Sequence, residues 1–241
     1  MLAVYEKNYY LRTSDFDCHG RIKPAAVLEM FQDAAGEHAG ILGCGFKQLA
    51  PRGLMWVLMR TKFELCAQPA MFDTVRIKTW PCPPARVGYR RDYGVYSHEG
   101  ELIAKGSSDW VLLDAESRTL VTNVSAYPED CEFLEERSFP GRLERLRPFE
   151  AQEEGFTIVP GYSRLDINGH VNNTAYADFV LDACGEKLSG KIKAFQIDYR
   201  RELKYGSAVT VNKLSTEDGM LFSGTDAEGE ISFLGRVICE E

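Results

Sequence analysis

Three polar residues with complementary chemistry alternate around a glycine in the second half of the chain. Asp166, Asn168 and His170 occupy every second position, and Gly169 stands between the last two. A carboxylate, an amide and an imidazole can bind a carbonyl group and can move protons to or from an attacking water. This turn is therefore the first place to look for chemistry.

A helix is predicted to begin directly after the turn. Asn172 and Asn173 can each cap it by accepting a hydrogen bond from a free backbone N–H. The apolar residues that follow at helical spacing are Tyr176, Phe179, Val180, Ala183 and Cys184. A helix start offers unpaired N–H groups and a partial positive charge. We therefore expect the backbone near Asn172 and Asn173 to bind a carbonyl oxygen or another electron-rich group.

The same turn has a purely structural interpretation. The short sequence Asp-x-Asn-Gly is typical of turns whose side chains satisfy their own backbone. For that fragment alone the structural interpretation is the better one. His170, the two further asparagines and the apolar helix together favour a binding or catalytic role.

Length, composition and charge narrow the class of protein. A chain of 241 residues with 44% apolar residues can form one large domain or two of ordinary size. The net charge of −8 and the pI near 5.2 argue against a general nucleic-acid binder, which normally carries a basic face. No stretch approaches the roughly 18 continuous apolar residues of a membrane span, so none is predicted.

Cysteine and histidine usage gives no sign of a metal or a disulfide framework. The seven cysteines are scattered without a Cys-x-x-Cys pair, and the chain has only four histidines. We expect free thiols, no zinc site and no cofactor. The first ten residues lack the features of a signal peptide, which predicts a cytoplasmic protein.

The order of predicted elements is strand, helix, then several antiparallel strands. An opening strand and turn are expected in residues 5–17, and Pro24 suits the first turn of a helix whose apolar stripe is Val27, Phe31, Ala34, Ala35 and His38. Alternating patterns then predict strands over residues 54–64, 73–80, 89–97, 102–113 and 120–123. Residues 128–155 are charged and broken by Pro and Gly, which predicts a linker over the surface.

The pattern of the first half returns in the second. Residues 14–22 align with residues 163–171 at a constant offset of 149, and the identities are Ser14, Asp17, Gly20, Asp33 and Ala34 with Ser163, Asp166, Gly169, Asp182 and Ala183. We interpret this as a duplicated unit, with an N-terminal unit over 1–127, a linker over 128–155 and a C-terminal unit over 156–241. His19 and Arg21 replace Asn168 and His170 in the first copy. One half is therefore expected to do the chemistry while the other provides scaffold or pocket.

A long helix enclosed by an antiparallel sheet, twice over, is the α+β architecture called a tandem hotdog. With it, the chain resembles the acyl-acyl carrier protein thioesterases of plant plastids and bacteria over nearly its whole length. The resembling segments are Trp56–Arg60, Tyr89–Tyr93, Ser107–Val111, Asp166–Asn173 and Ile197–Glu202. No single match is decisive, but five in the right order are specific.

The resemblance implies a catalytic set of Asp166, Asn168, His170 and Glu202. It also implies an acyl tunnel in the first half, lined by some of Met30, Phe31, Met55, Trp56 and Leu58. Some relatives carry a cysteine after the matching glutamate. This chain has Leu203 there, so a thiol nucleophile at that position is excluded.

The implied activity is hydrolysis of fatty acyl-carrier protein thioesters, as in fatty acid biosynthesis and lipid metabolism. One carboxylate, Asp166 or Glu202, would activate water as a general base, or would attack the thioester itself. The acidic carrier would need a basic patch, for which the candidates are Lys187, Lys191, Lys193, Arg200, Arg201 and Lys204. The alternatives are an acyl-CoA thioesterase and a non-catalytic acyl-binding hotdog protein, and either a monomer or a homodimer fits two units in one chain.

One pattern opposes the role of Glu202. In the strand predicted over residues 195–203, strict alternation puts Glu202 on the same face as Gln196, Asp198 and Arg200. From periodicity alone, Glu202 would be a solvated, salt-bridging residue. Only the family resemblance favours catalysis.

Overall fold

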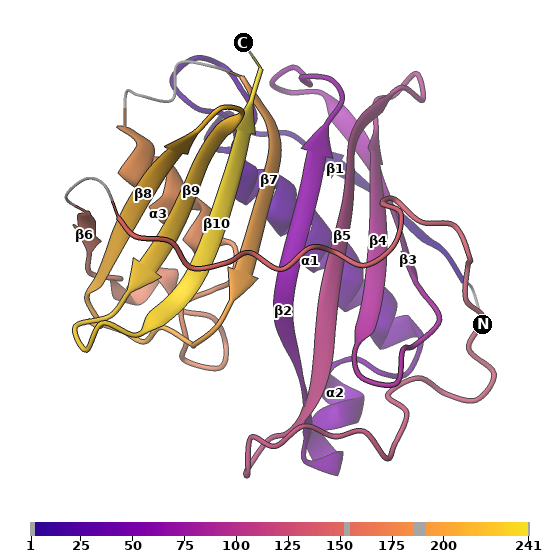
Figure 1. Cartoon of the computed structure of the whole chain (residues 1–241). Helices are drawn as coiled ribbons and strands as arrows, with labels where there is room; N and C mark the ends of the chain where they lie inside the picture. The colour runs from indigo at the N-terminus through magenta and orange to yellow at the C-terminus, as the bar shows by residue number, and fades with distance from the viewer. Residues whose placement is uncertain (1–2, 152–154, 186–190, 241) are drawn as a thin grey trace.

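A computed structural model describes residues 3–151, 155–185 and 191–240 of the chain. Ten strands form one antiparallel sheet, and two long helices lie together on one of its faces (Figure 1). The strands are β1 (Tyr5–Tyr10), β2 (Leu54–Leu65), β3 (Thr74–Pro81), β4 (Tyr89–Tyr96), β5 (Leu102–Asp114), β6 (Phe156–Ile158), β7 (Ile192–Tyr199), β8 (Val209–Thr216), β9 (Gly219–Thr225) and β10 (Ile231–Cys239). The α-helices are α1 (Pro24–Ile41), α2 (Phe46–Leu49) and α3 (Ala175–Cys184), and the short 3-10 helices are η1 (Thr13–Asp15), η2 (Ala50–Arg52) and η3 (Tyr162–Arg164).

The strand order repeats within the sheet. It runs β1-β3-β4-β5-β2 and then β7-β10-β9-β8-β6, so each strand of the first half has a counterpart in the second at the mirrored position. Both halves place their long helix between the first and second strand. The duplication read from the residue identities is thus also a duplication of topology, and β2 and β7 join the halves edge to edge.

Most elements predicted for the first half are present within a few residues of their predicted bounds. Helix α1 begins at Pro24, and its predicted stripe is buried. The strand predicted over residues 120–123 is wrong, because this segment makes only an isolated bridge between Leu113 and Leu120. In the second half, the apolar stripe of α3 is buried as predicted, with Cys184 in the core and 2% exposed. No helix in the described ranges has the length and apolar character needed to cross a membrane.

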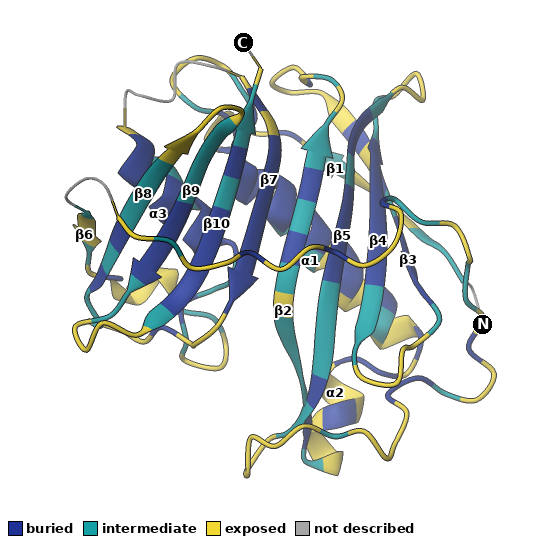
Figure 2. Ribbon diagram, in the orientation of Figure 1, coloured by how far each residue is buried: buried dark blue, intermediate teal, exposed yellow. Residues whose placement is uncertain are grey.

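The two helices and the inner sheet face enclose one continuous apolar core (Figure 2). Phe63 of β2 and Phe195 of β7 are paired across the junction of the halves, with ring centroids 5.6 Å apart and at most 1% exposure. On the sheet face that carries the helices, burial of these two aromatic rings therefore stabilises the junction between the halves through the hydrophobic effect.

The opposite sheet face is covered by the chain that connects the halves. No helix or strand occurs in residues 128–151, which run across the front of the sheet in Figure 1. Gln196 Nε2 donates to the Glu144 carbonyl at 2.8 Å, and the Leu146 N–H donates to Asp198 Oδ2 at 3.0 Å. The predicted surface linker is thus bound to the sheet by hydrogen bonds.

The close approach of α1 to the sheet depends on a glycine in β5. A Cβ at Gly106 would lie 2.1 Å from the Phe31 ring, which stacks on Tyr93 with centroids 4.2 Å apart. Gly106→Ala is therefore expected to lower the free energy of unfolding by about 1–3 kcal/mol, because neither ring can move freely in a close-packed core. Chemical denaturation measures this.

The matched control is Gly36→Ala on the exposed side of α1, where a Cβ meets nothing within 4 Å. It is expected to raise stability by up to about 1 kcal/mol, since glycine is a poor residue for a helix interior. Equal effects from both substitutions would contradict the packing argument.

Candidate active site

The turn from Asp166 to His170 is held by its own carboxylate. The Asp166 N–H donates to the His170 carbonyl at 2.7 Å, and the Gly169 N–H donates to the Asp166 carbonyl at 3.1 Å. Asp166 Oδ1 accepts from the N–H groups of Asn168 and His170, at 2.8 and 3.2 Å, while Asn168 Nδ2 lies 3.2 Å from Oδ2. Gly169 has φ +76°, which favours glycine. The structural interpretation of this turn is therefore right, and it leaves the His170 ring free for another role.

The first copy of the turn has the same hydrogen bonds with different chemistry. Asp17 Oδ1 accepts from the N–H groups of His19 and Arg21, both at 2.9 Å, and Gly20 has φ +71°. Arg21 Nε then donates to Asp17 Oδ2 at 2.9 Å. Although burial acts to raise it, hydrogen bonds from the Arg21 and His19 backbone and from the guanidinium hold the pKa of Asp17 below its usual value. Here the carboxylate is neutralised by a cation, and His19 is exposed.

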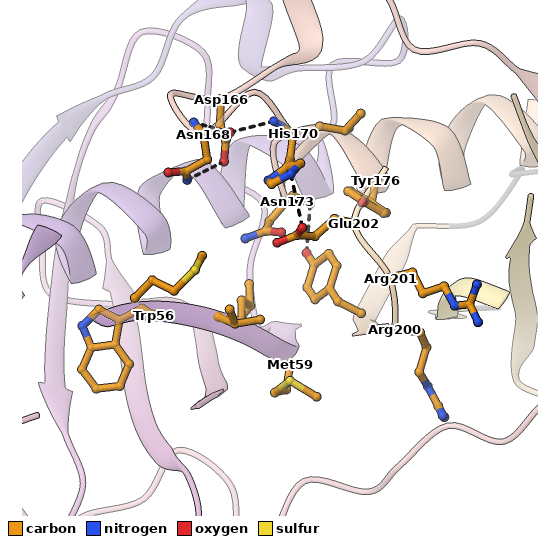
Figure 3. A pocket seen from close by; sticks show the side chains of 15 residues that line it. Trp56, Met59, Asp166, Asn168, His170, Asn173, Tyr176, Arg200, Arg201 and Glu202 are labelled. Atoms are coloured by element: carbon orange, nitrogen blue, oxygen red, sulfur yellow. Dashed lines mark hydrogen bonds and ion pairs between the residues drawn. The ribbon is translucent and has the colours of Figure 1, made fainter. Parts of the chain in front are cut away.

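Glu202 is exposed and ion-paired, as alternation predicted, and it also lies beside His170, as the family resemblance implied. Strand β7 ends at Tyr199, and the N–H groups of Arg200 and Arg201 both donate to the Ser232 carbonyl, at 2.9 and 3.0 Å. Two residues facing one acceptor are the mark of a β-bulge, which shifts the side-chain alternation. Glu202 Oε2 is 3.3 Å from His170 Nε2 (Figure 3).

Backbone contacts tie the Glu202 segment to the Asp166–His170 turn. The Val171 N–H donates to the Leu203 carbonyl at 2.8 Å, and His170 and Lys204 form a β-bridge. The Leu203 N–H donates to the Tyr176 hydroxyl at 3.1 Å. The backbone segments that carry His170 and Glu202 are therefore hydrogen-bonded to each other, which fixes the position of the pair.

Arg118 reaches this pair from the first half, and sequence reasoning missed it. Its Nη1 lies 3.0 Å from Glu202 Oε1, across 84 positions of sequence. Arg118 is an ordinary arginine in a polar turn, so no pattern in the sequence marks it. Its proximity to Glu202 is a consequence of the sheet that joins the halves.

A cavity of about 130 Å³ opens at the pair. Its walls come from the Asp166–His170 turn, the bulge after β7, the start of α3 and strand β2 (Figure 3). The lining residues are Met55, Trp56, Val57, Leu58, Met59, Asp166, Asn168, His170, Val171, Asn173, Tyr176, Tyr199, Arg200, Arg201 and Glu202. All four predicted catalytic residues and three predicted acyl-pocket residues, Met55, Trp56 and Leu58, are thus brought together.

A second, smaller cavity continues toward α1. Its volume is about 20 Å³, and it shares Leu58, Asn173 and Tyr199 with the first. Phe31, predicted for the acyl pocket, lines this inner cavity. Met30 instead belongs to the core, where it is 1% exposed. Phe31 is buried in the same core, at 3% exposure, so only its contact with the inner cavity distinguishes it from Met30.

Two buried tyrosines fix the start of α3. Burial raises the pKa of Tyr176 to about 12 and that of Tyr199 well above its ordinary value, so both hydroxyls stay protonated at neutral pH. Tyr199 donates to the Asn173 carbonyl at 2.9 Å, which holds Asn173 at the cavity wall.

The N-cap of α3 is Thr174, one residue after Asn173 and two after Asn172, the two predicted caps. The Thr174 side chain makes no capping bond. Asn172 Oδ1 instead accepts from the Thr174 N–H at 3.0 Å, as in an Asx turn leading into the helix. Asn172 therefore shapes the backbone, while Asn173 faces the cavity.

The basic candidates for carrier docking do not form one patch. Arg200 and Arg201 line the cavity, and Lys204 is exposed close by, next to Glu202. Lys191 and Lys193 lie at the other end of the eight-residue strand β7, roughly 26 Å away at 3.3 Å per residue. Lys187 lies outside the described residues.

Both halves of the chain are similar to known proteins. The chain matches the model of the acyl-ACP thioesterase N-terminal domain over residues 3–127 and that of the acyl-ACP thioesterase C-terminal domain over residues 150–234. It is 27% identical to a chloroplastic palmitoyl-acyl carrier protein thioesterase of Gossypium hirsutum, over 90% of this chain and 57% of that protein. It is 29% identical to a chloroplastic dodecanoyl-[acyl-carrier-protein] hydrolase of Cinnamomum camphora, over 90% of this chain and 62% of that one. The chain thus spans about three fifths of the length of these curated relatives.

Solved structures confirm the predicted fold. An acyl-ACP thioesterase from Bacteroides thetaiotaomicron superposes with a TM-score of 0.85 at 23% identity, covering 99% of this chain and 98% of that one. The 12:0-ACP thioesterase from Umbellularia californica gives 0.83 at 25% identity, with 100% and 98% covered. The fold is α+β and tandem hotdog, with both units in one sheet. On its two matched domains, the chain belongs to the acyl-ACP thioesterase family.

Proposed function

We propose that this protein hydrolyses fatty acyl thioesters of acyl carrier protein, releasing the free fatty acid and the carrier with its thiol. The observation that carries the proposal is the His170–Glu202 pair, 3.3 Å apart at the wall of a cavity whose other side is apolar. A carboxylate and an imidazole at an apolar cavity provide proton transfer beside a site for a hydrocarbon chain.

Glu202 is the better candidate for the general base. Its side chain is 40% exposed and one oxygen faces His170, whereas the Asp166 carboxylate already accepts from three donors in its own turn. In the proposed reaction, Glu202 takes a proton from water as the water oxygen attacks the thioester carbon. The C–S bond then breaks and the sulfur leaves as a thiolate, which needs little assistance because a thiol pKa is near 8.5.

His170 and Asn168 would orient the water or the substrate carbonyl. His170 Nε2 lies 3.3 Å from Glu202, so His170 can pass the proton that Glu202 took from water to the thiolate once the C–S bond has broken. Asp166, by fixing the backbone of both residues, would keep them at the correct place. Direct attack of Glu202 on the thioester would instead form an anhydride, and the carboxylate would have to leave its contacts with Arg118 and His170.

The developing oxyanion would be stabilised at the start of α3. Asn173 lies at the cavity wall immediately before the helix, where the helix dipole places partial positive charge. The acyl chain would enter between Met55, Trp56 and Leu58 and extend toward the inner cavity beside Phe31. Since that inner cavity holds only about 20 Å³, the side chains around it must move to admit a chain.

The test is thiol release from a panel of acyl carrier protein thioesters and the matching acyl-CoAs, with chain length varied in both. We expect faster release from the carrier protein than from CoA, with a maximum at one chain length. Release only from acyl-CoA would contradict the carrier specificity and identify an acyl-CoA thioesterase. Tight acyl binding without release from either donor would identify a binding protein.

A further inference from the structure

We propose that Arg118, contributed by the first half, is a positioning residue of the active site that holds the Glu202 carboxylate in its working orientation. The inference rests on the proposed thioesterase function and concerns the same site. It makes the catalytic centre composite, with the general base on one half and the group that orients it on the other.

The geometry at Glu202 assigns a different partner to each carboxylate oxygen. Arg118 Nη1 is 3.0 Å from Oε1, and His170 Nε2 is 3.3 Å from Oε2. With Arg118 at one oxygen and His170 beside the other, the carboxylate has less freedom to rotate than an unpaired one. Because Arg118 binds Oε1, Glu202 Oε2 stays directed toward His170 and the cavity, where it can accept a proton.

Arg118 also contacts the apolar wall of the cavity. The same Nη1 lies 3.3 Å from the Met55 sulfur, and Met55 lines the cavity. Arg118 therefore bridges strand β2 of the first half and the bulge after β7 in the second, next to where a substrate would enter.

The turn that carries Arg118 is built to present it. Asp114 Oδ1 accepts from the N–H groups of Glu116 and Ser117, at 3.2 and 2.8 Å, and from the Ser117 hydroxyl at 2.9 Å. The Arg118 N–H donates to the Asp114 carbonyl at 3.0 Å. This network, together with the Leu113–Leu120 bridge, fixes the direction in which Arg118 leaves the sheet.

Backbone strain at Arg118 points to function rather than stability. Its φ is +58°, a left-handed conformation that residues other than Gly and Asn seldom adopt. The ion pair it makes is exposed, at 44% for Arg118 and 40% for Glu202, and exposed pairs stabilise a fold very little. Strain without a compensating gain in stability is typical of residues kept for a functional site.

The test uses Arg118→Asn, because asparagine tolerates the left-handed conformation but is too short to reach Glu202. We expect kcat for the carrier thioester to fall about tenfold, with KM changed less than twofold and Tm unchanged or higher. Arg118→Lys keeps a cation and should restore part of kcat. The control is Arg76→Gln. It breaks an exposed ion pair between β3 and β1, at the edge of the sheet away from the site, and should leave kcat unchanged.

A double-mutant cycle gives the second readout. If Arg118 acts through Glu202, Arg118→Asn should have no further effect on the residual rate of Glu202→Gln. An additive loss, a lowered Tm that accounts for the loss, or unchanged kcat in Arg118→Asn would each overturn the inference. A wild-type protein that releases no thiol from any donor would instead refute the proposed function, so the two failures are distinguishable.

Discussion

Glu202→Gln and His170→Ala are each expected to reduce kcat for the carrier thioester by about 10²- to 10⁴-fold, the range supplied by a positioned general base. Gln keeps the shape of Glu202 but cannot take a proton, and Ala removes the imidazole that lies 3.3 Å from the carboxylate. Steady-state thiol release with saturating substrate measures the loss. The two losses should not add in the double variant, because the residues act as a unit.

The duplicated turn offers a matched control within the same molecule. Asp166→Ala and Asp17→Ala remove the same Asx-turn hydrogen bonds from the two copies. We expect Asp166→Ala to lose at least as much turnover as predicted for His170→Ala, and the first-copy variants Asp17→Ala and His19→Ala to keep most of it. Comparable losses from both copies would refute the assignment of one active half.

Asp198→Ala is expected to destabilise the protein by about 3–5 kcal/mol, the cost of leaving one partner of a buried ion pair alone. Asp198 is 1% exposed and accepts Arg60 Nε at 2.9 Å and Nη2 at 3.0 Å, directly across the β2–β7 junction. It also accepts from the Leu146 N–H, so the substitution loosens both the junction and the connecting chain. Urea denaturation should show the loss, with Tm lower by about 6–20 °C for a chain of this size.

The control for Asp198 is Asp218→Ala. Asp218 pairs with Arg236 at 2.7 Å but is 48% exposed, so its loss should cost less than about 1 kcal/mol. Equally small effects of both substitutions would show that the Arg60–Asp198 ion pair contributes little to the junction of β2 and β7.

Patterns in the sequence were enough to predict most elements of the first half, the duplication and the Asp166–His170 turn. These are local properties: helical and alternating spacing follow from backbone geometry, and the Asp-x-Asn-Gly turn closes through hydrogen bonds within five residues. Identities at a constant offset of 149 reflect a repeated fold because the same turn needs Asp and Gly in both copies.

The positions of Glu202 and Arg118 in the site depend on contacts between distant parts of the chain. Alternation assumed an unbroken strand through residue 203, but a bulge at Arg200 and Arg201 ends it and turns Glu202 toward His170. Met30 and Phe31, adjacent in sequence, are both buried in the core, but only Phe31 also lines a cavity. Arg118 and Glu202 meet because β2 and β7 join two halves into one sheet, and a contact across 84 positions leaves no local pattern in the chain.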